Sequence, residues 1–204
     1  MMQRLDYLRE SPSQTAGPYV HIGCTPAFTG IDIYGADLGS RMITGPVQGQ
    51  RITLRGCVYD GTGTPLRDAM VEIWQPDAAG LFASANEVRG QADPNFTGWG
   101  RSPGDMDTGE FVFETVKPGA VPWPAGGMQA PHITVWIVAR GINIGLHTRC
   151  YFADEEEANA ADPILSRIEH QNRVPTLLAQ PEAEGRYRFD IQLQGPGETI
   201  FFDM

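Results

Sequence analysis

Short runs in which apolar and polar residues alternate dominate the chain from residue 51 onward. In residues 69–77, for example, Val71 and Ile73 alternate with Glu72 and Trp74 before Pro76 ends the run. Successive side chains of a β-strand point to opposite faces of its sheet, so this alternation predicts a strand. The same pattern predicts further strands at residues 51–60, 108–116, 133–139, 146–152 and 186–194.

Two segments depart from this pattern. Residues 78–107 hold few periodic positions, and irregular segments of that length are usually functional or interfacial. Residues 153–180 have a helical character that Pro163 and Pro175 divide into short pieces. The sequence therefore predicts an all-β fold, an antiparallel β-sandwich with an extended N-terminal arm and a few short helices.

The first 50 residues read as an extended, turn-rich segment and not as a domain. We therefore predict an N-terminal arm and interface segment over residues 1–50 and one β-sandwich domain over residues 51–204. A chain of 204 residues is long enough to bury a sizeable core.

Charge and composition exclude several classes of function. The formal net charge of −10 argues against a nucleic-acid partner, which selects for a basic surface. We expect no membrane partner, because no run approaches about 18 consecutive apolar residues, and the N-terminus lacks the apolar stretch of a signal peptide. The chain is thus expected to be cytoplasmic. Its three cysteines are widely spaced without a CxxC pair, which favours neither a disulfide framework nor a zinc site.

The sequence APHITVW places one histidine at the head of a predicted strand. Alternation puts the side chains of His132 and Thr134 on the same face. Two histidines in that arrangement would form a chelating pair, whereas this chain offers an imidazole and a hydroxyl. The position is therefore a metal site, a remnant of one, or something else.

Several ordered stretches resemble one family. These are GCVYDGTGTPLRDAMVEIWQPDAAGLF, DPNFTGWGR, TGEFVFETVKPGAVPW, APHI and RYRFDIQLQGPGETIFFD. They resemble the intradiol ring-cleavage dioxygenases, in particular the members that act on protocatechuate and O2. The resemblance implies non-haem Fe(III) bound by two tyrosines and two histidines, and phenolate oxygens suit such a hard cation.

The resemblance also locates the expected ligand positions, and most are changed. The two tyrosine positions hold Phe82 and Val121, and the second histidine position holds Thr134, so that only His132 is kept. A family arginine just upstream corresponds to Gln129. These five residues are predicted to form a degenerate iron site, with His132 either a structural remnant or part of another ligand site.

Protocatechuate-cleaving members consist of two homologous chains, a beta chain that carries iron and a second chain that has lost the ligands. This sequence resembles the second chain. The resemblance implies Fe(III) held by the partner beta chain, no metal bound by this chain, and no catalytic residue within it.

A chain without iron can still form part of its partner's pocket. The resemblance implies that Thr15, Gly17, Pro18 and Arg140 lie near the substrate, with Arg140 attracting a ring carboxylate. The alternatives are a simple turn for the first three residues and an ordinary surface arginine for the last.

Two rival functions remain at this point. One is a catalytic dioxygenase with an altered ligand set, and the other is a β-sandwich binding module with no role in ring cleavage.

Overall fold

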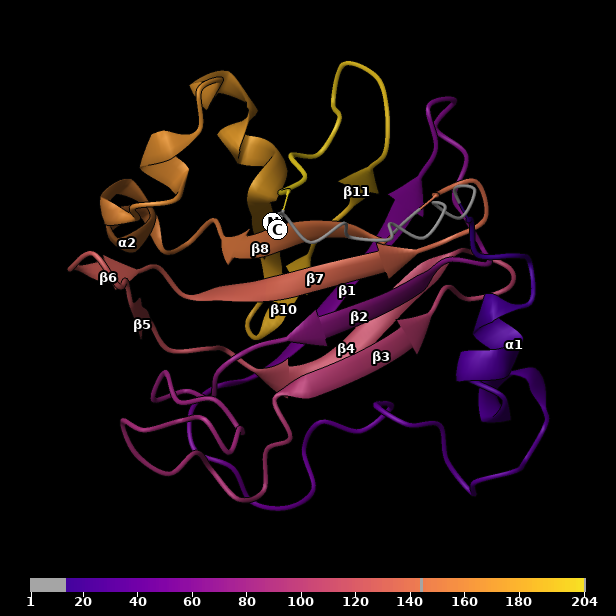
Figure 1. Cartoon of the computed structure of the whole chain (residues 1–204), viewed down its shortest axis with the longest axis horizontal. Helices are drawn as coiled ribbons and strands as arrows, with labels where there is room; N and C mark the ends of the chain where they lie inside the picture. The colour runs from indigo at the N-terminus through magenta and orange to yellow at the C-terminus, as the bar shows by residue number, and fades with distance from the viewer. Residues whose placement is uncertain (1–13, 144, 204) are drawn as a thin grey trace, which may run out of the picture.

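The computed structural model describes residues 14–143 and 145–203, and most of this chain is strand and loop (Figure 1). The strands are β1 (Arg51–Tyr59), β2 (Met70–Trp74), β3 (Trp99–Pro103), β4 (Glu110–Val116), β5 (Val121–Pro122), β6 (Met128–Gln129), β7 (His132–Val138), β8 (Leu146–Phe152), β9 (Leu178–Ala183), β10 (Arg186–Arg188) and β11 (Ile191–Gln192). The helices are α1 (Val20–Cys24) and α2 (Glu156–Ala161), with 3-10 helices at Ala27–Thr29, Leu165–Arg167 and Gln171–Leu177.

The main sheet is mixed and curls until its two ends meet. Its order is β11-β1-β10-β9-β8-β7-β2-β3, and β4 also pairs with β1. β1 runs parallel to β10 and β11, and β8 runs parallel to β9, while the other pairs are antiparallel. β10 and β11 follow one another along β1, and β4 is a further neighbour of β1, so that β4 and β3 are the two edges that meet. The backbone N–H of Val112 on β4 donates to Ser102 Oγ on β3 at 3.2 Å, which links these two edges.

The β-rich class is therefore confirmed, but the sheet is mixed and barrel-like, so a purely antiparallel sandwich is not what the structure has. The alternation of apolar residues reports that one face of each strand is buried. It carries no information about strand direction or about whether two layers or one curled sheet enclose the core.

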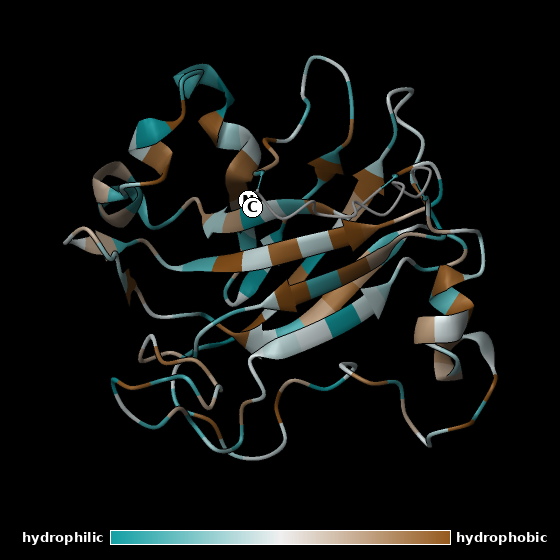
Figure 2. Ribbon diagram, viewed as in Figure 1, coloured by the Kyte–Doolittle hydropathy of each residue, from teal (hydrophilic) through white to brown (hydrophobic). Residues whose placement is uncertain are grey.

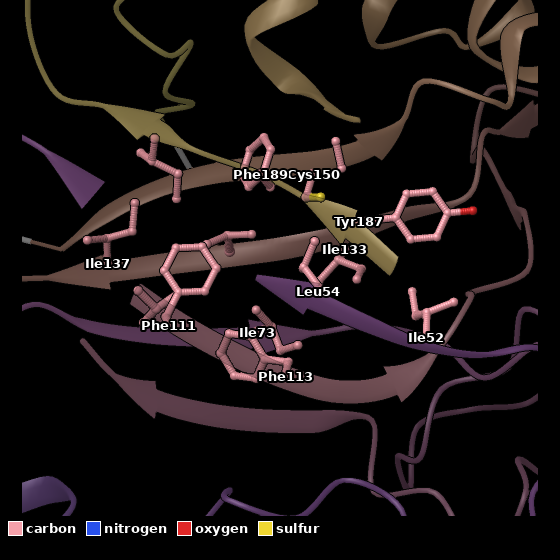
Figure 3. Close-up of a cluster of buried hydrophobic side chains, with 14 of the residues drawn as sticks. Ile52, Leu54, Ile73, Phe111, Phe113, Ile133, Ile137, Cys150, Tyr187 and Phe189 are labelled. Carbon is pink, nitrogen blue, oxygen red and sulfur yellow. The ribbon is translucent and has the colours of Figure 1, made fainter. Parts of the chain in front are cut away.

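The core lies inside this curled sheet. Side chains from β1, β2, β4, β7, β8 and β10 point toward one another there (Figure 3). Hydrophobic and polar segments alternate along β7, as Figure 2 shows, and the inward residues Ile133, Val135 and Ile137 are at most 1% exposed. The alternation in the sequence thus identifies the buried face of each strand correctly.

Most predicted strands are confirmed, and four strands, β3, β5, β6 and β9, went unpredicted. The predicted strand 186–194 is interrupted at Phe189 and Asp190, although β10 and β11 keep one register along β1. β3 lies in the segment expected to be irregular, because its buried positions are Gly100 and Ser102, small residues that give no apolar signal. β9 lies in the segment expected to be helical.

The remaining part of residues 153–180 forms α2 and two 3-10 helices, all of them short. Pro163 separates α2 from the first 3-10 helix as predicted, but Pro175 lies inside the second, Gln171–Leu177, and does not divide the segment. This segment packs on the sheet through a second small cluster of buried residues, Ala130, Tyr151, Leu165 and Leu177. The Asp162 carboxylate accepts hydrogen bonds from the backbone N–H groups of Ala130, Ile164 and Leu165. Asp162 thereby connects the helical segment to the residues that precede β7.

The N-terminal segment from residue 14 to 50 contains α1 and one 3-10 helix and otherwise runs over the surface (Figure 1). Isolated β-bridges attach it to the sheet domain at Ala16 with Arg140 and at Ile43 with Phe96. Residues 1–13 of the predicted arm lie outside the described residues. None of the helices in the described ranges is long and apolar enough to span a membrane.

Candidate functional site

A cavity of about 440 Å³ opens beside the first residues of β7. It is lined by all five residues of the predicted degenerate iron site, Phe82, Val121, Gln129, His132 and Thr134, together with Arg149. The five come from four parts of the chain, a loop, β5, β6 and β7. Folding therefore brings together five residues that only the family resemblance had connected in the sequence.

Local structure explains how these side chains reach the cavity. His132 and Thr134 are two residues apart on β7, so they lie on the same face, as the alternation predicted. Val121 and Gln129 are directly paired in the small antiparallel β5–β6 sheet. The ring of Phe82 stacks on Trp74, with 5.9 Å between centroids and 10° between planes.

His132 is buried and electrically neutral. Its Nδ1 lies 2.8 Å from the carbonyl oxygen of Ala130, and because a carbonyl only accepts, Nδ1 carries the proton and Nε2 keeps its lone pair. Burial, with a smaller contribution from the nearby Arg149 charge, lowers the pKa of His132 from 6.5 to about 4. The imidazole is therefore uncharged at neutral pH.

Arg149 is a site residue that the sequence interpretation missed. It lies on β8 directly opposite Thr134 on β7. Its Nη1 donates to Gln129 Oε1 at 2.8 Å and to the Tyr151 hydroxyl oxygen at 3.3 Å. Alternation along β8 places Arg149 on the same face as Tyr151, but only the pairing of β7 with β8 shows that this face meets the cavity.

The donor set around the cavity does not suit Fe(III). Phe82 and Val121 supply no donor atom, Thr134 supplies a neutral hydroxyl, and His132 supplies one imidazole nitrogen. Fe(III) favours several anionic oxygen ligands, whereas a guanidinium cation, that of Arg149, lines this cavity. In the described ranges, no group of three or more His, Cys, Asp or Glu side chains is arranged to hold a metal ion.

The other predicted site residues lie at a second place in the fold. Thr15 Oγ1 accepts a hydrogen bond from the backbone N–H of Gly141 at 2.9 Å, and Ala16 forms a β-bridge with Arg140. Arg140 is exposed and makes an ion pair with Asp68, with 3.2 Å between Nη2 and Oδ2. Thr15 and Arg140 are therefore neighbours in the fold, although 125 positions separate them (140 − 15).

Gly17 and Pro18 belong to the same exposed segment, just before α1. None of the described residues has an atom within 4 Å of the position that a Cβ on Gly17 would occupy, so no close approach among these residues requires a glycine there. Arg140 also lines a cavity of about 550 Å³, which it shares with Leu66, Ile142 and Leu193.

The two sites lie at opposite ends of β7. His132 begins the strand and Arg140 follows its last residue, Val138. Six residue steps at about 3.3 Å each make the strand alone about 20 Å long. Arg140 is therefore too far away to act on a molecule in the cavity beside His132 of the same chain.

The sequences of known proteins are similar to this chain over most of its length. The family model described as "Dioxygenase" matches residues 26–195. The protocatechuate 3,4-dioxygenase alpha chain of Pseudomonas putida is 46% identical over 202 residues, which cover 98% of this chain and 98% of that one. The protocatechuate 3,4-dioxygenase beta chain of Burkholderia cepacia is 32% identical over 185 residues, with 82% of this chain and 78% of that chain covered.

Solved structures show the same fold at lower identity. The 3-chlorocatechol 1,2-dioxygenase of Rhodococcus opacus 1CP superimposes with a TM-score of 0.57 at 22% identity, covering 76% of this chain and 65% of that one. That structure shows the shared fold, and the family model and the P. putida relative show that the chain belongs to the intradiol ring-cleavage dioxygenases, an iron-dependent family. Within that family, the similarity to an alpha chain of protocatechuate 3,4-dioxygenase extends over almost every residue, whereas the similarity to a beta chain is lower and shorter.

Proposed function

We propose that this chain is the alpha subunit of a protocatechuate 3,4-dioxygenase hetero-oligomer and binds no iron itself. The enzyme opens the ring of protocatechuate with O2 between the two hydroxyl-bearing carbons, giving 3-carboxy-cis,cis-muconate. One observation carries the proposal. A cavity lies where the resemblance expects the metal site, but its walls hold Phe82, Val121 and Thr134 at the expected ligand positions, and Arg149 adds a positive charge.

The partner in this proposal is a beta chain that holds Fe(III). The chain's similarity to both an alpha chain and a beta chain supports two homologous kinds of subunit in one assembly. Iron in the partner would supply the chemistry of ring opening. The residues of this chain would bind and orient the substrate and shape the pocket.

Arg140 and Thr15 are the residues of this chain that we assign to the partner's pocket, with Gly17 and Pro18 beside them. The Arg140 side chain is 65% exposed, so a molecule outside this chain can reach its guanidinium. Asp68 contacts one of its nitrogens and limits its orientation. On a chain with a net charge of −10, such a cation provides a local attraction for the carboxylate of the substrate.

The surface of the N-terminal segment supports an interface role for residues 1–50. Large apolar side chains are usually buried, but in this segment Ile33, Tyr34 and Leu38 are 62–66% exposed and Tyr19 is 74% exposed. Three of these four side chains lie close together in the sequence, and exposed apolar side chains that gather in one patch mark a site of association. We assign this segment to contacts with the partner chain and residues 51–204 to the sheet domain.

The test compares the chain purified alone with the chain co-expressed with a beta chain. Iron content, assembly mass and O2 consumption with protocatechuate are measured for both. Iron and activity found only in the complex support the proposal. Stoichiometric iron and ring opening in the isolated chain would show an altered ligand set, and a monomer with no affinity for the beta chain would favour a binding module.

A further inference from the structure

The cavity beside β7 has a positive character on an acidic protein. Among the residues that line it, none is acidic and two, Arg89 and Arg149, are basic. Arg89 is neutralised by an ion pair with Glu87. The guanidinium of Arg149 has no carboxylate within 4 Å in the part of the chain that the structure describes.

Neither hydrogen-bond partner of Arg149 carries a charge. The Tyr151 hydroxyl donates in turn to the Asp162 carboxylate at 3.5 Å, and the guanidinium lies 5.9 Å from the centroid of the Phe202 ring, so among the described residues a carboxylate reaches Arg149 only through Tyr151. Gln129 is a neutral amide, and burial raises the pKa of Tyr151 to about 12, so that its hydroxyl is also neutral at neutral pH. Both bonds leave from Nη1, and a guanidinium carries further N–H donors in a planar fork that matches a carboxylate. A half-buried cation of this kind favours an anionic ligand.

The other walls select an aromatic molecule. Phe82 and Trp123 line the cavity with Val121, Pro122 and Pro124, which makes much of its surface apolar. The indole Nε1–H of Trp123 is buried and has no hydrogen-bond partner among the described residues. His132 provides an acceptor at Nε2, because its Nδ1 proton is held by Ala130.

We propose that this cavity is a metal-independent binding site for a hydroxylated aromatic carboxylate. The carboxylate pairs with the Arg149 guanidinium, the ring lies against Phe82 and Trp123, and a ring hydroxyl donates to His132 Nε2. The cavity volume of about 440 Å³ falls within the ~300–1,000 Å³ of small-molecule sites. Binding here involves no chemical step.

The experiment uses the full-length chain in whatever assembly it is isolated, with 4-hydroxybenzoate as the probe and 4-hydroxybenzamide as a neutral molecule of the same shape. Binding is measured by isothermal titration calorimetry in the presence of a chelator. We expect one molecule of 4-hydroxybenzoate to bind per copy of this chain. Its affinity should exceed that of 4-hydroxybenzamide by at least about tenfold. Equal affinity for the two probes, or no binding of 4-hydroxybenzoate, would overturn the proposal.

Variants assign the binding to this cavity. Arg149→Gln removes the charge, and the loss of a charge-assisted hydrogen bond predicts about 10–100-fold weaker binding of 4-hydroxybenzoate. Arg149→Lys keeps the charge but not the fork and should bind with intermediate affinity. Trp123→Phe keeps an apolar ring but reduces the aromatic surface against which the ligand ring lies, and should weaken binding several-fold. Arg41→Gln removes an equal charge from an exposed position and serves as the matched control.

The outcomes separate this site from the subunit proposal. Loss of 4-hydroxybenzoate binding in Arg149→Gln but not in Arg41→Gln supports the site, whether or not a beta chain associates. If Arg149→Gln fails to fold, the carboxylate preference of the native chain and the Trp123→Phe affinity still decide the question. Unchanged affinity in both Trp123→Phe and Arg149→Lys would reject the assignment, even in an assembly that cleaves protocatechuate.

Discussion

Thr134 on β7 and Arg149 on β8 are directly paired across two antiparallel strands, and both line the cavity beside His132. The resemblance to the intradiol ring-cleavage dioxygenases places a metal-binding histidine of that family at the position of Thr134. Here a hydroxyl stands opposite a guanidinium. A fixed positive charge thus lies beside the position where the resemblance expects a ligand, and it opposes a bound cation by Coulomb repulsion.

The first prediction follows from that charge. Restoring the expected ligands with Phe82→Tyr, Val121→Tyr and Thr134→His should give only weak iron binding while Arg149 is present. Adding Arg149→Gln should strengthen Fe(III) binding by at least about tenfold, because the repulsion is removed. Iron per chain and the visible tyrosinate–iron absorption are the measurements.

The matched control adds Arg41→Gln to the same three substitutions. It lowers the net charge by the same amount at an exposed position. Equal iron affinity in the two quadruple variants would show that Arg149 does not govern metal exclusion.

The second prediction concerns Arg140 in the complex with a beta chain. Arg140→Gln should lower kcat/KM for protocatechuate by about tenfold at low salt and by less at high salt, because screening weakens the lost attraction. The melting temperature should stay nearly constant, since the ion pair with Asp68 involves an arginine side chain that is 65% exposed. Steady-state O2 consumption at two ionic strengths checks this.

A salt-independent loss of activity in Arg140→Gln would point to a direct contact and not to steering. Unchanged kcat/KM in Arg140→Gln would show that Arg140 is an ordinary surface arginine with no role in substrate binding.

The third prediction is a pH effect on stability from His132. Its pKa is 6.5 when unfolded and about 4 when folded, so between these values the unfolded chain binds more protons. The stabilisation is fully present above about pH 6.5 and is lost as the pH falls toward 4, up to about 3 kcal/mol. Urea unfolding of the native chain and of His132→Asn at pH 7 and pH 4.5 measures it.

Because the other histidines are unchanged in the variant, their contributions cancel in the difference. The native chain should lose more stability between the two pH values than His132→Asn does. The same loss in both proteins would mean that His132 is protonated in the folded chain at pH 4.5.

The fourth prediction concerns Gly56 in the middle of β1. A Cβ at this position would lie 1.9 Å from the carbonyl oxygen of Phe189, in the interruption between β10 and β11. Since backbone cannot move aside as a flexible side chain does, Gly56→Ala should destabilise the fold by at least about 2 kcal/mol. Urea denaturation is the measurement.

Gly23→Ala is its control, because no atom of residues 14–143 or 145–203 lies within 4 Å of the added Cβ and the residue lies in α1. Alanine favours helix over glycine, so stability should be unchanged or slightly higher. Similar losses in the two variants would remove the steric explanation.

The ordered motifs named five residues, Phe82, Val121, Gln129, His132 and Thr134, and folding brings all five to one cavity. Whether that cavity is a remnant of an iron site stays a prediction. The strand pattern gave the β-rich class and most of the strands. It missed β3, whose inward residues Gly100 and Ser102 are not apolar, and it gave no sign that β8 and β9 run parallel.

The sequence alone determined local features: which residues alternate, where turns fall and which ligand types are absent. These features depend only on side-chain chemistry and short-range geometry. Only the tertiary structure decided which side chains meet. Register across β7 and β8 places Arg149 beside Thr134, and a β-bridge brings Arg140 to Ala16, next to Thr15. Such pairings join residues far apart in the chain, and no local preference of either residue encodes them.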